Sequence, residues 1–171
     1  RTKVSCSTTC MPFRRSRLRA SPKPADPPRR AVVRGPRTVL SNIIASQQAL
    51  HARYGGVVPE IASRAHIQRI LPVIQESLKS AGVAMKDLRA VAVGHRPGLI
   101  GSLLVGVAAA KALAWSLGKP LVGVDHVQAH LYAAALDGAA LEFPALGLVV
   151  SGGHTSLYAM DSSLEMRLLG S

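Results

Sequence analysis

Residues 88–136 alternate between short apolar runs and longer helix-forming segments, and this alternation constrains the fold more than any other feature. The apolar runs are Leu88–Gly94 and Leu121–Val124, each of strand length. The helix-forming segments are Leu99–Leu117, which is rich in alanine and glycine, and His126–Leu136. Strand, helix, strand, helix is typical of parallel strands joined by crossover helices. The sequence therefore predicts an α/β protein.

Further elements are expected before this core. Val39–Ala45 contains β-branched residues that suit a strand. Pro59 and Glu60 suit the first turn of a helix, because a missing N–H is harmless there and a carboxylate meets the positive end of the helix dipole. Gly82 suits the end of the same helix. Pro72 lies inside it and predicts a kink or a split, because proline removes a hydrogen bond.

After Pro144 the pattern changes to strands alone. Ala145–Val150 and Thr155–Met160 are strand-like and flank Ser151–His154, whose two glycines suit a turn. We expect these segments to form a β-hairpin. Leu164–Leu169 predicts a third strand of the same meander.

Composition and pattern divide the chain into three parts. Residues 1–37 hold 11 Lys/Arg and one acid, Asp26, a net charge of +10, whereas residues 38–171 hold 10 Lys/Arg and 8 acids, a net charge of +2. The first part is rich in Arg, Pro and Ser without periodicity and predicts a disordered basic tail. A frameshift, a wrongly assigned start and an organellar transit peptide are alternatives. Two further parts are expected to follow: residues 38–142, and a second unit, 143–171, that begins with a β-meander and is cut short.

The sequence predicts a cytoplasmic protein without a membrane segment. Its two cysteines, Cys6 and Cys10, lack the spacing of a zinc or redox pair, and the rest of the chain has none, which suits a reducing compartment. The longest charge-free run, Phe143–Met160, contains Pro144 and Gly152–Gly153, so it suits strands better than a membrane helix.

His126 and His130 are spaced four apart in an expected helix. Both imidazoles would lie on one face and could reach one metal ion, which needs at least a third protein ligand. Two helix histidines with ordinary partners explain the spacing too, and spacing alone slightly favours this interpretation. In the zinc-peptidase pattern a glutamate follows the first histidine, but Val127 and Gln128 stand here, so the residue that would activate water is missing.

Three other segments are candidates for binding or catalysis. Ser151–Thr155 has the small residues of an anion-binding turn, and an ordinary tight hairpin explains its glycines equally well. Arg96–Ser102 lies between an expected strand and an expected helix, where N–H groups favour an anion, although tight packing also explains its glycines. Glu60, Arg64 and His66 suit either a catalytic or a surface role by their position.

Four segments, taken in order, resemble the tRNA threonylcarbamoyladenosine transferase family of the TsaD/Kae type, once labelled O-sialoglycoprotein endopeptidases. They are Tyr54–His66, Pro97–Gly106, Gly123–His130 and Val149–Thr155. The resemblance extends over residues 38–171. It implies part of the actin/hexokinase/Hsp70-like (ASKHA) ATPase fold, with most of the first lobe and the first strands of the second. It also implies transfer of a threonylcarbamoyl group from threonylcarbamoyl-AMP to N6 of adenosine 37 in tRNAs that read codons starting with A.

The resemblance also implies a site. His126 and His130 match two histidines that bind one divalent ion, iron or zinc, which would polarise the carbamoyl carbonyl during attack by the amine. The segment that matches the loop touching substrate or nucleotide, ATP or threonylcarbamoyl-AMP, comprises Val149, Val150, Ser151, Gly152 and Gly153. No catalytic residue is assigned. The aspartate expected as third metal ligand and the family's opening hairpin motif have no match, and Gly94–Leu99 departs from the family pattern.

Partners and alternatives follow from the same resemblance. The implied substrate is tRNA, and bacterial members act with an inactive TsaB-like paralogue and a small TsaE-like ATPase. With two of three metal ligands, the isolated 171-residue chain is expected to have negligible activity. One alternative is a metal-dependent peptidase, after the old family label. The other is a non-enzymatic RNA-binding protein that uses residues 1–37 and whose affinity falls steeply with salt.

Overall fold

The structure, a computed structural model, shows an α/β protein made of two compact units, Arg1–His126 and Val127–Ser171. The residues that it describes are 2–6, 29–35, 38–52, 54–56, 58–133, 141–150 and 155–171. Within these ranges, no helix has the length and apolar character needed to cross a membrane.

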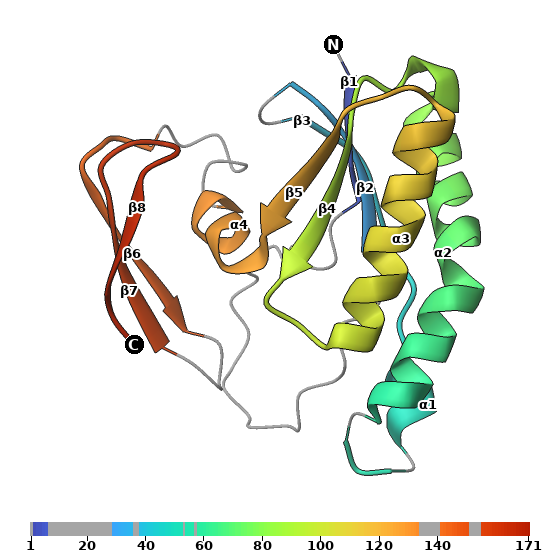
Figure 1. Cartoon of the computed structure of the whole chain (residues 1–171), viewed down its shortest axis with the longest axis horizontal. Helices are drawn as coiled ribbons and strands as arrows, with labels where there is room; N and C mark the ends of the chain where they lie inside the picture. Colours follow the sequence, from blue (N-terminus) through green and yellow to red (C-terminus); the bar gives the residue numbers. More distant parts are fainter. Residues whose placement is uncertain are drawn as a thin grey trace. The chain divides into compact units, whose positions relative to one another are not determined.

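The first unit contains a five-stranded mixed sheet (Figure 1). In spatial order its strands are β3 (Thr38–Ile44), β2 (Arg29–Arg34), β1 (Thr2–Cys6), β4 (Val91–Arg96) and β5 (Leu121–Asp125). β2 runs antiparallel to both β1 and β3, whereas β1, β4 and β5 are parallel. The parallel pair expected from residues 88–136 is therefore confirmed, with Val91 opposite Leu121.

Two long helices cover one face of this sheet (Figure 1). α2 (Pro59–Ala81) packs on β2 and β3, and α3 (Ile100–Ser116) packs on β4 and β5. The buried core between helices and sheet comprises Val32, Ile70, Ile74, Leu78 and Leu88 in one cluster, and Val91, Val93, Ala110 and Ala114 in another. A short helix, α1 (Gln48–Ala52), and a 3-10 turn, Met85–Asp87, complete the unit; the sequence analysis did not predict either.

The predicted disorder of residues 1–37 is wrong for two segments of this tail. Thr2–Cys6 forms β1, at the centre of the sheet, and Arg29–Arg34 forms β2. For β2 the reason lies in Val32, which is fully buried against α2 although arginines dominate the charge of its strand. β-branched residues suit a half-buried strand. Residues 7–28 lie outside the described ranges.

α2 begins and ends where the sequence predicts. Pro59 is its first residue, and Gly82 adopts the left-handed conformation, with φ of 63°, so that its N–H reaches the carbonyls of the last turn. The helix runs unbroken through Pro72, so of the two expected outcomes the split is excluded, and the kink stays a prediction. Pro72 itself is exposed, while Val73 and Ile74 beside it are buried and hold the helix on the sheet across the missing hydrogen bond.

The second unit is built on a three-stranded antiparallel sheet, in the order β6 (Ala145–Val150), β7 (Thr155–Met160) and β8 (Met166–Gly170). The expected hairpin is confirmed, and the third strand begins at Met166 rather than Leu164.

One helix, α4 (His126–Tyr132), leads into this unit. The prediction had extended it to Leu136, but residues 134–136 lie outside the described ranges. The Tyr132 hydroxyl donates a hydrogen bond to the Ser163 carbonyl, which ties the helix to the turn after β7. Burial raises the pKa of Tyr132 above its ordinary value.

Candidate functional site

Polar residues gather where two parallel strands of the first unit end. His95 and Arg96 are the last residues of β4, and Asp125 is the last residue of β5. The sequence analysis ended the expected strand at Gly94, but β4 continues through His95 and Arg96 because it pairs with β5 up to this point. The carboxyl edge of parallel strands is the usual place for a ligand in open α/β sheets, so this edge is the candidate site.

Two polar contacts fix the geometry of this edge. Arg96 Nε donates to Asp125 Oδ2 over 3.1 Å, and His95 Nδ1 donates to the carbonyl of Val124 over 3.1 Å. The Asp125 side chain is mostly buried, at 18% exposure, whereas that of Arg96 is 67% exposed. An ion pair with one exposed partner contributes about 0–1 kcal/mol to stability. The main effect of the ion pair is to orient Asp125, because it holds the carboxylate toward β4.

The two candidate metal-ligating histidines follow directly. α4 begins with His126 immediately after Asp125, and His130 lies one turn later on the same helix face. Both side chains are partly buried. In the part of the chain that the structure describes, no three His, Cys, Asp or Glu side chains gather closely enough to hold a metal ion. The two imidazoles therefore suit part of a ligand set, and the described residues do not complete it.

The predicted substrate loop is described only in part. Val149 and Val150 end β6, where they pair with Ser156 and Thr155 of β7. Val149 is half-buried and Val150 is exposed. Ser151, Gly152 and Gly153 lie outside the described residues, so their role stays a prediction.

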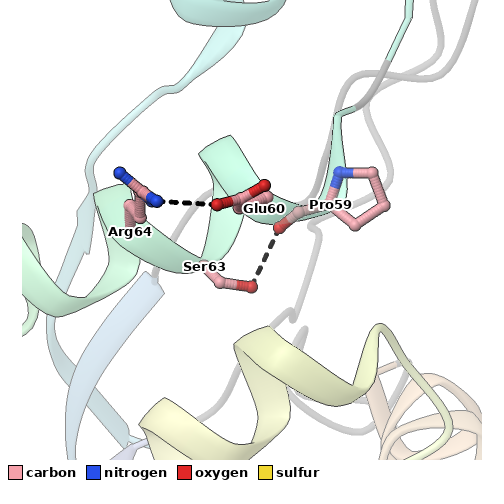
Figure 2. Close-up of polar contacts among 4 residues, drawn as sticks. All are labelled: Pro59, Glu60, Ser63 and Arg64. Carbon is pink, nitrogen blue, oxygen red and sulfur yellow. Dashed lines mark hydrogen bonds and ion pairs between the residues drawn. The ribbon is translucent and has the colours of Figure 1, made fainter.

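The start of α2 carries an exposed ion pair. Figure 2 shows Arg64 donating to Glu60 over 2.7 Å and the Ser63 hydroxyl donating to the Pro59 carbonyl over 2.9 Å. The side chains of Glu60 and Arg64 are 74% and 75% exposed. A pair spaced by one helical turn and this exposed is typical of a solvated helix surface. The geometry favours the surface interpretation for both residues.

His66, the third candidate on α2, is buried rather than exposed. Its Nδ1 donates to the Ala62 carbonyl over 2.7 Å and lies 3.2 Å from the side-chain amide of Gln47, which is also buried. His51 of α1 is also buried, and its Nδ1 accepts a hydrogen bond from the backbone N–H of Val58. These contacts hold α1 and the following loop against α2. The sequence analysis missed this role, because only the three-dimensional structure brings Gln47 to His66.

The glycine-rich segment Arg96–Ser102 runs into the first turn of α3, where Gly101 serves close packing. A Cβ on Gly101 would clash with the Ser63 hydroxyl of α2, so the glycine lets the two helices approach. This contact supports the packing interpretation of Arg96–Ser102. The anion-binding alternative stays a prediction.

Comparison with known proteins gives a direct result. A sequence model of the TsaD family, tRNA N6-adenosine threonylcarbamoyltransferase, matches residues 38–171. The chain belongs to this family. A relative of that name from Symbiobacterium thermophilum is 59% identical over 140 residues, and one from Moorella thermoacetica is 55% identical over 141 residues. The resemblance stated from four sequence segments is therefore confirmed.

The matches cover most of this chain but less than half of each relative. Each of these matches covers 82% of this chain and 41% of the TsaD relative, so the chain spans about two-fifths of the length of the relatives that it matches. Among solved structures, YeaZ from Pseudomonas aeruginosa is similar to this chain with a TM-score of 0.54 and 21% identity, over 99% of this chain and 66% of YeaZ. A second structure, an uncharacterized protein with similarity to peptidase YEAZ from Pseudomonas aeruginosa, also has a TM-score of 0.54, at 20% identity. At these identities the likeness shows the fold alone.

Proposed function

We propose that this chain carries part of a tRNA N6-adenosine threonylcarbamoyltransferase. The enzyme would transfer the threonylcarbamoyl group of threonylcarbamoyl-AMP to N6 of adenosine 37 in tRNAs that read codons starting with A. The observation that carries the proposal is the family match over residues 38–171, together with 59% identity to a relative of that name.

A chimera tests this function. Residues 38–171 replace the matched segment of the Symbiobacterium thermophilum relative, and the chimera is incubated with threonylcarbamoyl-AMP and tRNA. We expect threonylcarbamoyladenosine among the nucleosides detected by mass spectrometry after digestion of the tRNA. An inactive but folded chimera, beside an active intact relative, would argue against the proposal.

The fold proposed for the complete enzyme is the two-lobed ASKHA arrangement of actin, hexokinase and Hsp70-type ATPases. Two observations support it: the mixed sheet of the first unit with its helices, and the likeness of 99% of this chain to a solved YeaZ structure. On this proposal the first unit corresponds to the first lobe, and β6, β7 and β8 begin the second.

His126 and His130 are proposed to supply two ligands to one divalent ion, iron or zinc. Their shared face on α4 and their partial burial support this. The remaining ligand would come from the part of the transferase that this chain does not contain. The segment Val149–Gly153 is proposed to touch the nucleotide, since it leaves the end of β6.

A variant pair tests the metal role. In the chimera, His126→Ala is expected to lower the rate of transfer by about 100-fold or more. Mutation of a residue that only hydrogen-bonds a metal ligand already lowers metal affinity or activity by about 10–100-fold, and loss of the ligand itself should cost more. It should also lower the metal content measured by mass spectrometry. Gln128→Ala is the matched control on the same helix, where it is exposed, and should change neither quantity more than about twofold. Equal effects of both variants would remove the metal role from His126.

A TsaB-like paralogue is the proposed protein partner, and a TsaE-like ATPase is proposed from the family alone. Five large apolar side chains that are exposed on the two long helices support a protein contact, because exposed apolar surface marks interaction sites. They are Ile67 and Leu71 on α2, and Ile100, Leu104 and Trp115 on α3. Trp115 is 88% exposed, which a side chain of its size rarely is without a partner.

The proposed protein contact is tested by two substitutions, one at an exposed position on α3 and one at an exposed position in the second unit. Leu104→Asp in the chimera should weaken binding of the TsaB-like protein at least tenfold in calorimetry, because it places a charge in an apolar contact. Leu164→Asp, at an exposed position in the second unit, is the control and should leave the affinity unchanged. If neither variant changes the affinity, the TsaB-like protein does not bind through Leu104.

A further inference from the structure

Two side chains at the end of β4 hold the two residues that come just before His126. His95 Nδ1 donates to the Val124 carbonyl over 3.1 Å, and Arg96 Nε donates to Asp125 Oδ2, also over 3.1 Å. β5 ends at Asp125, and His126 is the next residue in the chain. The backbone that leads into His126 is therefore held from the neighbouring strand at two consecutive residues.

An irregularity in the strand pairing explains why these contacts form here. Gly94 is the last residue of β4 in regular register, paired with Val124. The next pair is Arg96 with Asp125, so His95 is one extra residue in β4. An extra residue of this kind is a β-bulge, which re-aims side chains and is frequent next to active sites. The bulge lets two adjacent residues of β4 both reach β5.

A glycine in β5 makes room for the His95 ring. A Cβ added at Gly123 would lie 3.2 Å from His95 Nδ1 and 3.5 Å from its Cε1. The shorter of these distances is tighter than an ordinary van der Waals contact, so a side chain at residue 123 would push the ring away. Glycine inside a strand often marks such a close approach. Gly123 thus lets the imidazole lie over β5, within reach of the Val124 carbonyl.

We propose that His95 and Arg96 are positioning residues for His126. They hold the Val124 carbonyl and the Asp125 carboxylate, and so they fix the backbone from which the His126 side chain leaves. Groups that orient a metal ligand raise metal affinity, because less freedom is lost when the metal binds. The inference rests on the proposed metal role of His126. It assigns no contact with the metal to either positioning residue.

The exposure of these side chains favours a role in orientation over a role in folding. Arg96 is 67% exposed and its partner Asp125 is 18% exposed. His95 is exposed as well. Ion pairs and hydrogen bonds at exposed positions add little to stability. Substitutions of His95 and Arg96 should therefore leave the protein folded, as circular dichroism can show, and act on His126 alone.

Zinc affinity tests the proposal, because it is measured without the transfer reaction. In the chimera that carries residues 38–171, the affinity is obtained by competition with a chromogenic chelator. His95→Ala and Arg96→Gln should each lower it about threefold, and about tenfold together. This is less than the loss of a direct partner of a metal ligand, because both residues act through the backbone.

Conservative variants separate positioning from a general effect of substitution. His95→Asn keeps an N–H donor in place of Nδ1, and Arg96→Lys keeps the positive charge, so both should stay within about twofold of the unchanged chimera. Lys111→Gln, which removes an exposed charge from α3, is the control and should have no effect. Equal losses with His95→Asn and His95→Ala would contradict the assigned role of the Nδ1 donor.

A double-mutant cycle with Gly123 gives a second readout. Gly123→Ala should lower zinc affinity about threefold when His95 is present and should have no effect in the His95→Ala variant, because the ring is the group that it displaces. A folded His95→Ala/Arg96→Gln variant with unchanged zinc affinity, beside a loss in His126→Ala, would overturn the positioning role and leave the proposed function standing. Unchanged affinity in His126→Ala as well would overturn the metal role itself.

Discussion

Gly101 shows how one missing side chain sets the distance between two helices. A Cβ at this position would clash with the Ser63 hydroxyl of α2, and that hydroxyl is itself engaged with the Pro59 carbonyl. The clash in Gly101→Ala should therefore lower the free energy of unfolding by about 1–3 kcal/mol. The higher helix propensity of alanine should offset about 1 kcal/mol of this loss. Urea denaturation followed by circular dichroism measures the difference. Adding Ser63→Ala should recover most of the loss, because the clash disappears with the hydroxyl.

Gly106 is the matched control for this prediction. It also lies in α3, and an added Cβ there would lie 3.9 Å from Val93 Cγ2, an ordinary contact. Gly106→Ala should leave stability unchanged or raise it by up to about 1 kcal/mol. Equal destabilisation by both substitutions would mean that Ser63 does not limit the approach of α2 to α3.

Local signals at single residues were predictable, and distant contacts were not. Pro59 and Gly82 mark the ends of α2 correctly because each acts through its own backbone geometry. His66 could not be assigned, since its burial depends on Gln47, 19 residues earlier in the chain. The spacing of His126 and His130 predicted their shared helix face. It could not predict that Asp125, just before them, would pair with Arg96 of another strand.

At the scale of elements, the high net charge of residues 1–37 led the sequence analysis to miss two strands. β1 and β2 lie within residues 1–37, whose net charge of +10 argued for a solvated tail. Whether a strand forms depends on the faces that it buries, and Val32 alone fills a place in the core beside Ile70 and Leu88. By contrast, β3 to β8 followed from short apolar or β-branched runs of strand length, and α2 and α3 from their end signals and from their alanine- and glycine-rich composition.

Substitution within β2 tests this correction. Val32→Asp should lower the free energy of unfolding by more than about 3 kcal/mol, because it buries an unpaired charge. Arg34→Asp, on the same strand but exposed, should change stability by about 0.5 kcal/mol or less. Thermal unfolding followed by circular dichroism distinguishes them. If Val32→Asp is as mild as Arg34→Asp, β2 is not part of the folded core.

The same strands change how the RNA-binding alternative is tested. Removing residues 1–37 would take β1 and β2 out of the sheet, so lost binding would report lost folding. Changing Arg14, Arg15, Arg17 and Arg19 to serine avoids both strands. If these arginines contact phosphates, the slope of log affinity against log salt should fall by roughly the number of lost contacts. An unchanged slope for a folded variant would contradict that alternative.

At the scale of the whole molecule, the chain matches part of the length of a transferase family. The family match spans residues 38–171, and the matched relatives are more than twice as long as the matched segment. The family motifs predict a metal role for His126 and His130, and the described residues bring no third His, Cys, Asp or Glu to them, so that role stays a prediction.

The most direct test of the account is the amount of threonylcarbamoyladenosine formed in one assay by two proteins at equal concentration. One is the isolated 171-residue chain, and the other is the chimera that carries residues 38–171 within the Symbiobacterium thermophilum relative. The account predicts the modified nucleoside from the chimera and none above background from the isolated chain. A comparable rate from the isolated chain, or none from a folded chimera while the intact relative is active, would contradict it.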